Sequence, residues 1–128
     1  MLGKQAYGKT HQVVGIRIDK EEAGEMSFDR QVLSLANRAA TLAGLNHEFG
    51  AEDIMLNEHY LGAGYGVMGA LEEEAIAITA RTEGILLDPV YTGRAMGGLF
   101  DMVRSGELVQ GDRVLFWHTG GTPALFAD

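Results

Sequence analysis

Short apolar runs and longer helical stripes alternate along the chain. Residues 13–18 form a run rich in β-branched side chains that a charged stretch closes, which is typical of a strand followed by a surface loop. Residues 85–87 and 113–117 are two further apolar runs beside glycine, aspartate or proline turn signals. Residues 53–60 form a weaker run of mixed apolar and polar residues. The pattern therefore predicts four strands.

Helical stripes separate these runs. Ser27 is a suitable N-cap for a first helix, and Gly44 is a suitable stop for it. A second helix is predicted over residues 70–83 and a third from Thr92 to residues 105–106. The positions that recur at three- and four-residue steps are Val32, Leu35, Ala36, Ala39, Ala40 and Ala43 in the first helix, Leu71, Ala75, Ile78 and Thr82 on the inner face of the second, and Met96, Leu99, Phe100 and Val103 in the third.

The alternation of strands and helices, with a last short helix after residue 122, predicts one α/β domain over residues 1–128 with a parallel sheet and flanking helices. Such sheets bind ligands at the carboxyl ends of their strands. Residues 88–93 and 118–123 follow predicted strands and are rich in glycine, hydroxyl groups and tyrosine, as are residues 60–66. These loops are candidate ligand sites, although Thr92 is equally suited to cap a helix.

Composition and charge narrow the function. Of the 128 residues, 46% are hydrophobic and 22% charged, which is typical of a folded globular chain. The formal net charge of -8 repels phosphate backbones and anionic membranes, so neither nucleic acid nor a membrane is an expected partner. The chain has no cysteine, and no apolar run resembles a signal peptide or a membrane span. We therefore expect a soluble, cytoplasmic protein without disulfides.

Two glycine patterns imitate nucleotide-binding motifs. Residues 3–10 match G-x-x-x-x-G-K-T, but only two residues precede them and a strand follows, whereas the phosphate loop needs a strand before it and a helix after it. Residues 64–69 match G-x-G-x-x-G, yet the glutamates that follow would compete with a pyrophosphate for the helix N-terminus. A tight turn with positive φ angles is the favoured interpretation of the second pattern.

Metal binding and carboxylate catalysis are not favoured. Histidine and acidic residues gather along residues 47–59, but their spacing matches no ligand motif, and such residues near loops are usually solvated. The three glutamates Glu72, Glu73 and Glu74 are interpreted as charges that favour the helix N-terminus. No metal site is expected.

Two long, ordered segments carry a family resemblance. E-G-I-L-L-D-P-V-Y-T-G-R-A-M-G-G-L at residues 83–99 and V-L-F-W-H-T-G-G-T-P-A-L-F at residues 114–126 closely resemble the D-cysteine desulfhydrase and 1-aminocyclopropane-1-carboxylate deaminase family. The G-x-G-Y-G loop at residues 62–66 fits the same family. The resemblance implies a part of the large domain of the tryptophan-synthase-β-like fold, with pyridoxal 5'-phosphate as cofactor and a small amino acid as substrate.

The resemblance also implies a site. Tyr65 and Tyr91 correspond to the paired catalytic tyrosines beside the substrate and the cofactor ring, where donor or anchor is the expected role because a phenol has a pKa of about 10. Thr92 and Thr119 correspond to cofactor-binding positions near the pyridine nitrogen. Gly120 and Gly121, which follow Thr119, would let the backbone approach the ring.

The two threonines bear on the expected reaction. The deaminases of the family carry a glutamate where this chain has Thr92, and a carboxylate there would keep the ring nitrogen protonated and make a strong electron sink. A hydroxyl supports a milder sink, which suffices when a good leaving group departs from Cβ. The resemblance therefore favours elimination of sulfur from D-cysteine or L-cysteate, giving pyruvate and ammonia.

The family's Schiff-base lysine and its phosphate-binding loop lie upstream of the matched segments. Lys4, Lys9 and Lys20 are the only lysines of the chain, and none has the family's context. We therefore expect a C-terminal part of the lyase, with the N-terminal half absent, that is inactive alone and needs that half or self-association. The first alternative is a non-catalytic truncated domain that self-associates or binds a partner, and the second is deaminase-type activity on aminocyclopropane carboxylate.

Overall fold

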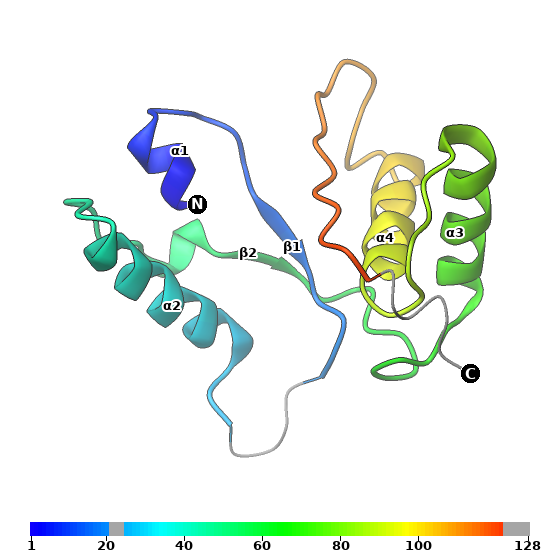
Figure 1. The fold of residues 1–128 in the computed structure, drawn as a ribbon, viewed down its shortest axis with the longest axis horizontal. Coiled ribbons are helices and arrows are strands. Elements are labelled where there is room, and N and C mark those ends of the chain that lie inside the picture. Colours follow the sequence, from blue (N-terminus) through cyan, green and yellow to red (C-terminus); the bar gives the residue numbers. More distant parts are fainter. Residues whose placement is uncertain (21–24, 122–128) are drawn as a thin grey trace. The chain divides into compact units, whose positions relative to one another are not determined.

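The computed structural model describes residues 1–20 and 25–121. Two strands, β1 and β2, pair side by side and run in the same direction (Figure 1), so the predicted α/β class with a parallel sheet is confirmed. The elements in chain order are α1 (Leu2–Ala6), β1 (Val14–Ile16), α2 (Phe28–Leu42), the 3-10 helix η1 (Ala51–Asp53), β2 (Met55–Asn57), α3 (Ala70–Glu83) and α4 (Thr92–Arg104).

The chain forms two compact units. The first comprises residues 1–15 and 21–57, and the second comprises residues 16–20 and 58–128. In the first unit, helix α2 packs its small residues Ala36 and Ala40 against Phe49. The Asn37 amide reinforces this contact, because it donates to the Phe49 carbonyl at 3.1 Å and accepts from the Phe49 amide at 2.7 Å. The single-domain organisation stays a prediction.

The predicted helices are confirmed because their ends are encoded locally. Ser27 is the N-cap of α2, and Gly44 and Gly84 follow α2 and α3 with φ angles of 67°, a left-handed conformation that glycine adopts without strain. Within the motif at residues 64–69, Gly64 and Gly66 also have positive φ angles, which confirms a tight turn there. Residues 2–6 are helical, so the first part of the G-x-x-x-x-G-K-T match is not a loop.

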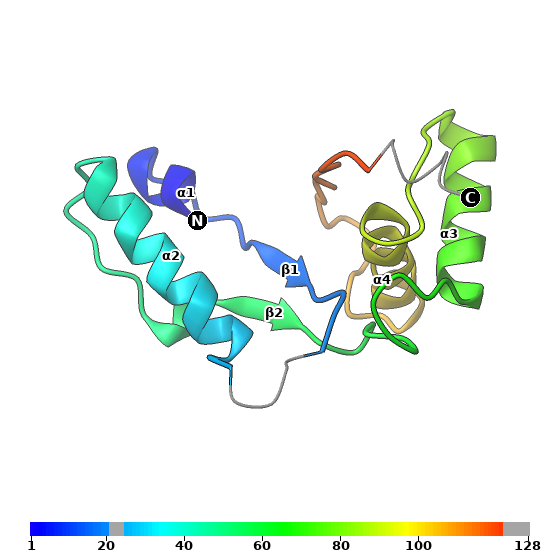
Figure 2. The same ribbon diagram turned by 60° about the horizontal axis from the view of Figure 1, so that its bottom comes forward.

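In the second unit, α3 and α4 lie side by side (Figure 2), and small residues on α4 permit this close contact. A methyl group at Gly97 would overlap the Leu71 side chain and lie 3.0 Å from the Leu71 carbonyl oxygen. One at Gly98 would lie 2.9 Å from the Tyr60 ring. Gly97 therefore sets the spacing of the helix pair, and Gly98 makes room for the Tyr60 ring against α4.

We expect Gly97→Ala to lower the free energy of unfolding by about 1–3 kcal/mol, because the added methyl group overfills the α3–α4 contact. Urea denaturation followed by circular dichroism measures this change. Gly3→Ala in α1 is the control, since a side chain there meets nothing within 4 Å and alanine favours a helix. Equal stability of Gly97→Ala and the unmodified chain would show that the helices can separate at little cost.

The predicted inner face of α3 is partly wrong. Ala75 is fully buried as expected, but Glu72 and Thr79 are the other buried residues, and Thr82 is exposed. The Thr82 hydroxyl donates to the Ile78 carbonyl at 3.0 Å, which satisfies it on the helix surface. Glu72 is drawn inward by an ion pair with a buried arginine of α4, a contact that hydrophobic periodicity does not register.

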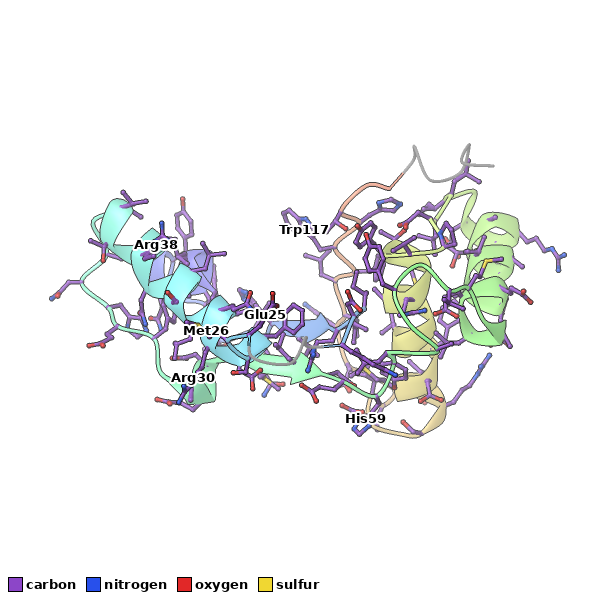
Figure 3. The ribbon with its side chains drawn as sticks, turned by 90° about the horizontal axis from the view of Figure 1, so that it is seen from below. Glu25, Met26, Arg30, Arg38, His59 and Trp117 are labelled. Carbon is purple, nitrogen blue, oxygen red and sulfur yellow. The ribbon has the colours of Figure 1, made fainter. Side chains whose placement is uncertain are left out.

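Two of the four predicted strands are wrong. Residues 85–87 and 113–117 form no strand, and among the described residues nothing pairs with them in a sheet. Their β-branched and aromatic side chains favour extended backbone, but a strand also needs a neighbour that satisfies its N–H and C=O groups. Leu115 and Trp117 are 83% and 76% exposed, and Trp117 points away from α3 and α4 (Figure 3). The helix expected after residue 122 lies outside the described residues.

Over residues 1–20 and 25–121, no helix has both the length and the hydrophobicity needed to cross a bilayer. Within the same ranges, no three histidine or acidic side chains converge on a place where a metal ion could bind.

Candidate active site

Tyr65 and Tyr91 come together in the second unit. Tyr65 lies in the loop between β2 and α3, and Tyr91 is the N-cap residue of α4. Their hydroxyl groups are hydrogen-bonded, and their rings meet edge to face with centroids 6.0 Å apart. Both side chains remain about half exposed, at 53% and 43%. The structure therefore presents two linked phenols to solvent.

The hydrogen bond changes the acidity of one phenol. The contact with the Tyr91 hydroxyl raises the pKa of Tyr65 above its ordinary value of 10, and desolvation and nearby acidic groups act in the same direction. A phenol with a raised pKa keeps its proton at neutral pH. Tyr65 is thus protonated and can donate a hydrogen bond, while the raised pKa makes it a weaker acid than a free phenol.

Asp88 places Tyr91 at the start of α4. Its buried carboxylate accepts hydrogen bonds from the backbone amides of Val90, Tyr91 and Thr92 at 2.9, 2.7 and 2.8 Å, and from the Thr92 hydroxyl at 2.6 Å. Burial acts to raise the pKa of Asp88, but these donors outweigh it and hold the pKa below its ordinary value. The carboxylate therefore caps the helix as an anion.

Thr92 belongs to this cap. Its side chain is 2% exposed, and its hydroxyl group donates to Asp88 Oδ1 while it accepts from the Asp88 amide at 2.9 Å. Thr92 is the first residue of α4 rather than its N-cap, which is Tyr91, and it donates to the capping carboxylate instead of supplying the cap, so the helix-cap interpretation of Thr92 is wrong. Its assignment to the pyridine nitrogen stays a prediction.

Arg94 donates hydrogen bonds to the loop that carries Tyr65, and it is a residue that the sequence pattern did not indicate. Arg94 is 1% exposed and forms an ion pair with Glu72, which also accepts from the Gly69 amide at 2.9 Å. Burial acts to raise the pKa of Glu72, but Arg94 and the backbone amides of Gly69 and Glu72 hold it below its ordinary value. An arginine in the first turn of an otherwise apolar helix was the available signal.

The segment 118–121 lies close to the residues that precede α4. A methyl group on Gly121 would lie 2.7 Å from Asp88 Cβ, so this position accepts only bare backbone. Gly120 and Gly121 have φ angles of 106° and 100°, which side chains rarely adopt. Thr119 is exposed. Tyr65 and Tyr91 therefore form one contact, and Thr92 and Gly121 form a second one around Asp88. The Gly120 amide instead bonds to His118.

His118 links residues 118–121 to Leu86 by hydrogen bonds. The Gly120 amide donates to His118 Nδ1 at 3.1 Å, so Nε2 carries the proton and donates to the Leu86 carbonyl at 3.1 Å. We expect His118→Phe to lose both bonds, each worth about 0.5–1.5 kcal/mol, and to speed hydrogen exchange at the Gly120 amide. His11→Phe, in the first unit, is the control. Unchanged exchange in His118→Phe would show that the loop is held by other contacts.

Pyridoxal phosphate needs a lysine for covalent attachment and a cradle for its phosphate. The roles of the tyrosine pair and of the Gly120–Gly121 backbone at such a site stay predictions. Lys20 is the only lysine in the second unit, and it is exposed in the charged loop. The residues around the tyrosines therefore do not fit the covalent attachment.

The chain matches no protein-family model. It is 42% identical over 127 residues to the 1-aminocyclopropane-1-carboxylate deaminase of Pseudomonas syringae pv. tomato and 42% identical over 125 residues to that of Methylobacterium nodulans. These matches cover 99% and 98% of this chain but 37% and 36% of the relatives. The chain thus spans little more than a third of the length of these relatives.

A solved structure agrees with these matches. The crystal structure of an ACC deaminase homologue superimposes with a TM-score of 0.69 at 30% identity, over 85% of this chain and 31% of that one. The fold is therefore that of part of an α/β pyridoxal-phosphate enzyme. The chain belongs to the 1-aminocyclopropane-1-carboxylate deaminase family and corresponds to the C-terminal part of its members. This confirms the resemblance carried by residues 83–99 and 114–126.

Proposed function

We propose that this chain supplies the substrate-facing tyrosines of a pyridoxal-phosphate enzyme that deaminates a small amino acid, in the manner of the 1-aminocyclopropane-1-carboxylate deaminases. The observation that carries the proposal is the hydrogen-bonded pair of Tyr65 and Tyr91, half exposed at the start of α4. The relatives at 42% identity support the deaminase class. They favour this activity over the sulfur elimination that Thr92 and Thr119 suggested.

The residues on this chain act on protons and orientation. Tyr65 is protonated at neutral pH, as any phenol is whose pKa is not lowered by several units, and Tyr91 lies at the other end of the same hydrogen bond. Such a pair can pass one proton to a bound amino acid while the second phenol holds the first in place. Tyr65 is therefore the proposed donor and Tyr91 the proposed anchor.

Sulfur elimination from D-cysteine or L-cysteate is the second candidate, and the threonines at positions 92 and 119 favour it. Only Thr119 has an exposed side chain in this structure, whereas the Thr92 hydroxyl is engaged with Asp88. If a hydroxyl group near the cofactor ring selects the sulfur substrate, Thr119 is therefore the residue proposed to provide it.

Activity is proposed to need a second polypeptide that provides the lysine, or self-association. The exposed apolar side chains of Val114, Leu115 and Trp117 support an association surface, since covering such groups with a partner is favourable. A non-catalytic chain that uses this surface only for binding is the competing proposal.

Complementation tests these proposals. The purified chain is mixed with pyridoxal phosphate, with and without a separately expressed N-terminal part of the Pseudomonas syringae relative. Visible absorbance of bound cofactor and ammonia release from aminocyclopropane carboxylate, D-cysteine and L-cysteate are then measured. We expect turnover only in the mixture, and fastest with aminocyclopropane carboxylate. Faster release from either sulfur substrate would favour the second candidate, and no release at all would favour the non-catalytic chain.

Tyrosine variants locate the activity on this chain. Tyr65→Phe is expected to reduce turnover in the mixture by about 10²–10⁴-fold, the usual contribution of a proton-transfer group. Tyr7→Phe is the matched control, because Tyr7 is 78% exposed in the first unit. Turnover of Tyr65→Phe equal to that of Tyr7→Phe would contradict the proposed donor.

A further inference from the structure

The Arg94 guanidinium is enclosed by backbone oxygens. Nη1 donates to the carbonyls of Ile18, Leu61 and Gly64 at 2.9, 2.7 and 3.3 Å, and Nη2 donates to the Val67 carbonyl at 2.8 Å. Nε donates to Glu72, so the ion pair closes the remaining side. Every nitrogen of this buried cation is thus engaged, and three of the carbonyls belong to the loop that carries Tyr65.

The loop is shaped around this side chain. Gly62 has a φ angle of 61°, and a methyl group there would lie 3.0 Å from Arg94 Nη2. The carbonyls of Gly64 and Val67, which Arg94 binds, lie just before and just after Tyr65 in the chain. The conformation of the loop therefore follows from the position of the guanidinium.

Arg94 also lies on the helix that carries the second tyrosine. It stands three residues after Tyr91, so both project from nearby positions in the first turn of α4. Asp88 fixes Tyr91 at the start of that turn, because its carboxylate accepts from the Tyr91 amide at 2.7 Å. One side chain thus links the helix of Tyr91 to the loop of Tyr65.

A smaller cation would not serve the same purpose. The planar guanidinium directs five N–H groups outward in a fixed fork, whereas the lysine ammonium is a compact charge with three donors. A buried ion pair is also a weak source of stability compared with apolar packing, because both charges lose their hydration. The arrangement therefore contributes mainly by fixing the positions of the loop carbonyls that Arg94 binds.

We propose that Arg94, held by Glu72, is the positioning residue that brings the Tyr65 hydroxyl to the Tyr91 hydroxyl. Its importance for turnover rests on the proposed function, but the positioning itself does not. Arg94 touches neither phenol and acts through the backbone of residues 61–67.

Phenol titration of the chain alone, without cofactor, tests the proposal. The ring-carbon signals of the tyrosines are followed with pH by nuclear magnetic resonance, which resolves Tyr65 from the other phenols. We expect Arg94→Lys to lose the upward shift of the Tyr65 pKa, since the loop no longer holds the contact with Tyr91. Arg104→Lys is the matched control, because Arg104 lies in the same helix and pairs with Glu74 on the surface.

Tyr60 reports on general loss of structure. It donates to Asp101 at 3.0 Å, and its burial and this contact raise its pKa to about 12. A positioning role predicts that Arg94→Lys moves the pKa of Tyr65 and leaves that of Tyr60 in place. An unchanged pKa of Tyr65, or an equal fall for both phenols, would overturn the proposal.

If Arg94→Lys does not fold, measurements on the unmodified chain still test the positioning role of Arg94. Nuclear magnetic resonance should show a slowly exchanging Arg94 Nε–H and a close contact between the Tyr65 and Tyr91 rings. Fast exchange of that proton, as in an exposed arginine, would overturn the proposal. Neither measurement uses turnover, so a failure of complementation leaves this inference standing, and its own failure leaves the proposed activity standing.

Discussion

Replacing Glu72 by alanine is expected to lower the free energy of unfolding by about 3–5 kcal/mol. The change leaves the Arg94 guanidinium as an uncompensated charge that is 1% exposed, and removal of one partner from a buried ion pair has a cost of this size. It also leaves the Gly69 amide without its acceptor at the start of α3. Urea denaturation followed by circular dichroism measures the loss.

Glu73→Ala is the matched control for this substitution. Glu73 is the next residue in the same first turn, it is exposed, and the exchange alters helix propensity by the same amount. The control should change stability by no more than about 0.5 kcal/mol. If both variants unfold at the same urea concentration, then the Glu72–Arg94 pair is not a determinant of this unit's stability.

Replacing Asp88 by alanine is expected to lower the free energy of unfolding by about 2–4 kcal/mol. A lost helix cap costs about 1 kcal/mol, and each buried donor left without an acceptor adds more. The change frees three backbone amides and the Thr92 hydroxyl together. Thermal and urea unfolding both report the effect.

Asp112→Ala is the control for Asp88→Ala. Asp112 also accepts a backbone amide, that of Val109 at 2.8 Å, but it does so at an exposed turn where water can replace it. We expect a loss of well under 1 kcal/mol. Comparable losses in the two variants would show that burial of the Asp88 carboxylate contributes little.

Both carboxylates should make stability depend on pH in the same direction. The pKa values of Glu72 and Asp88 are lowered in the folded chain, so the folded state binds fewer protons than the unfolded state near their unfolded values of about 4. Their stabilisation is therefore complete above that pH and is lost as the pH falls through the lower folded values. Between pH 7 and pH 3, the free energy of unfolding should fall less steeply with pH in Glu72→Gln and Asp88→Asn than in the unmodified chain. Equal slopes would contradict this origin of the pH dependence.

The two large effects come from polar groups, which is where the sequence was least informative. Glu72 and Arg94 are 22 residues apart, and the glutamate resembled its exposed neighbours Glu73 and Glu74 in the same helical turn. Burial distinguishes it from them, and burial depends on the approach of α4. Likewise, Asp88 was recognised as part of a turn, but its four donors become visible only when the first turn of α4 is in place.

The amino-acid sequence by itself determined the three longer helices, the tight turn at residues 64–69 and the family, because capping residues, glycines and ordered motifs act over a few neighbouring positions. Tertiary structure alone decided the pairing of the strands, since hydrogen-bonded partners lie far apart in the chain. It also decided the meeting of Tyr65 with Tyr91 across 26 residues and the enclosure of Arg94. These contacts arise when helix α4 and a glycine loop pack together, so the site depends on a geometry that no local pattern contains.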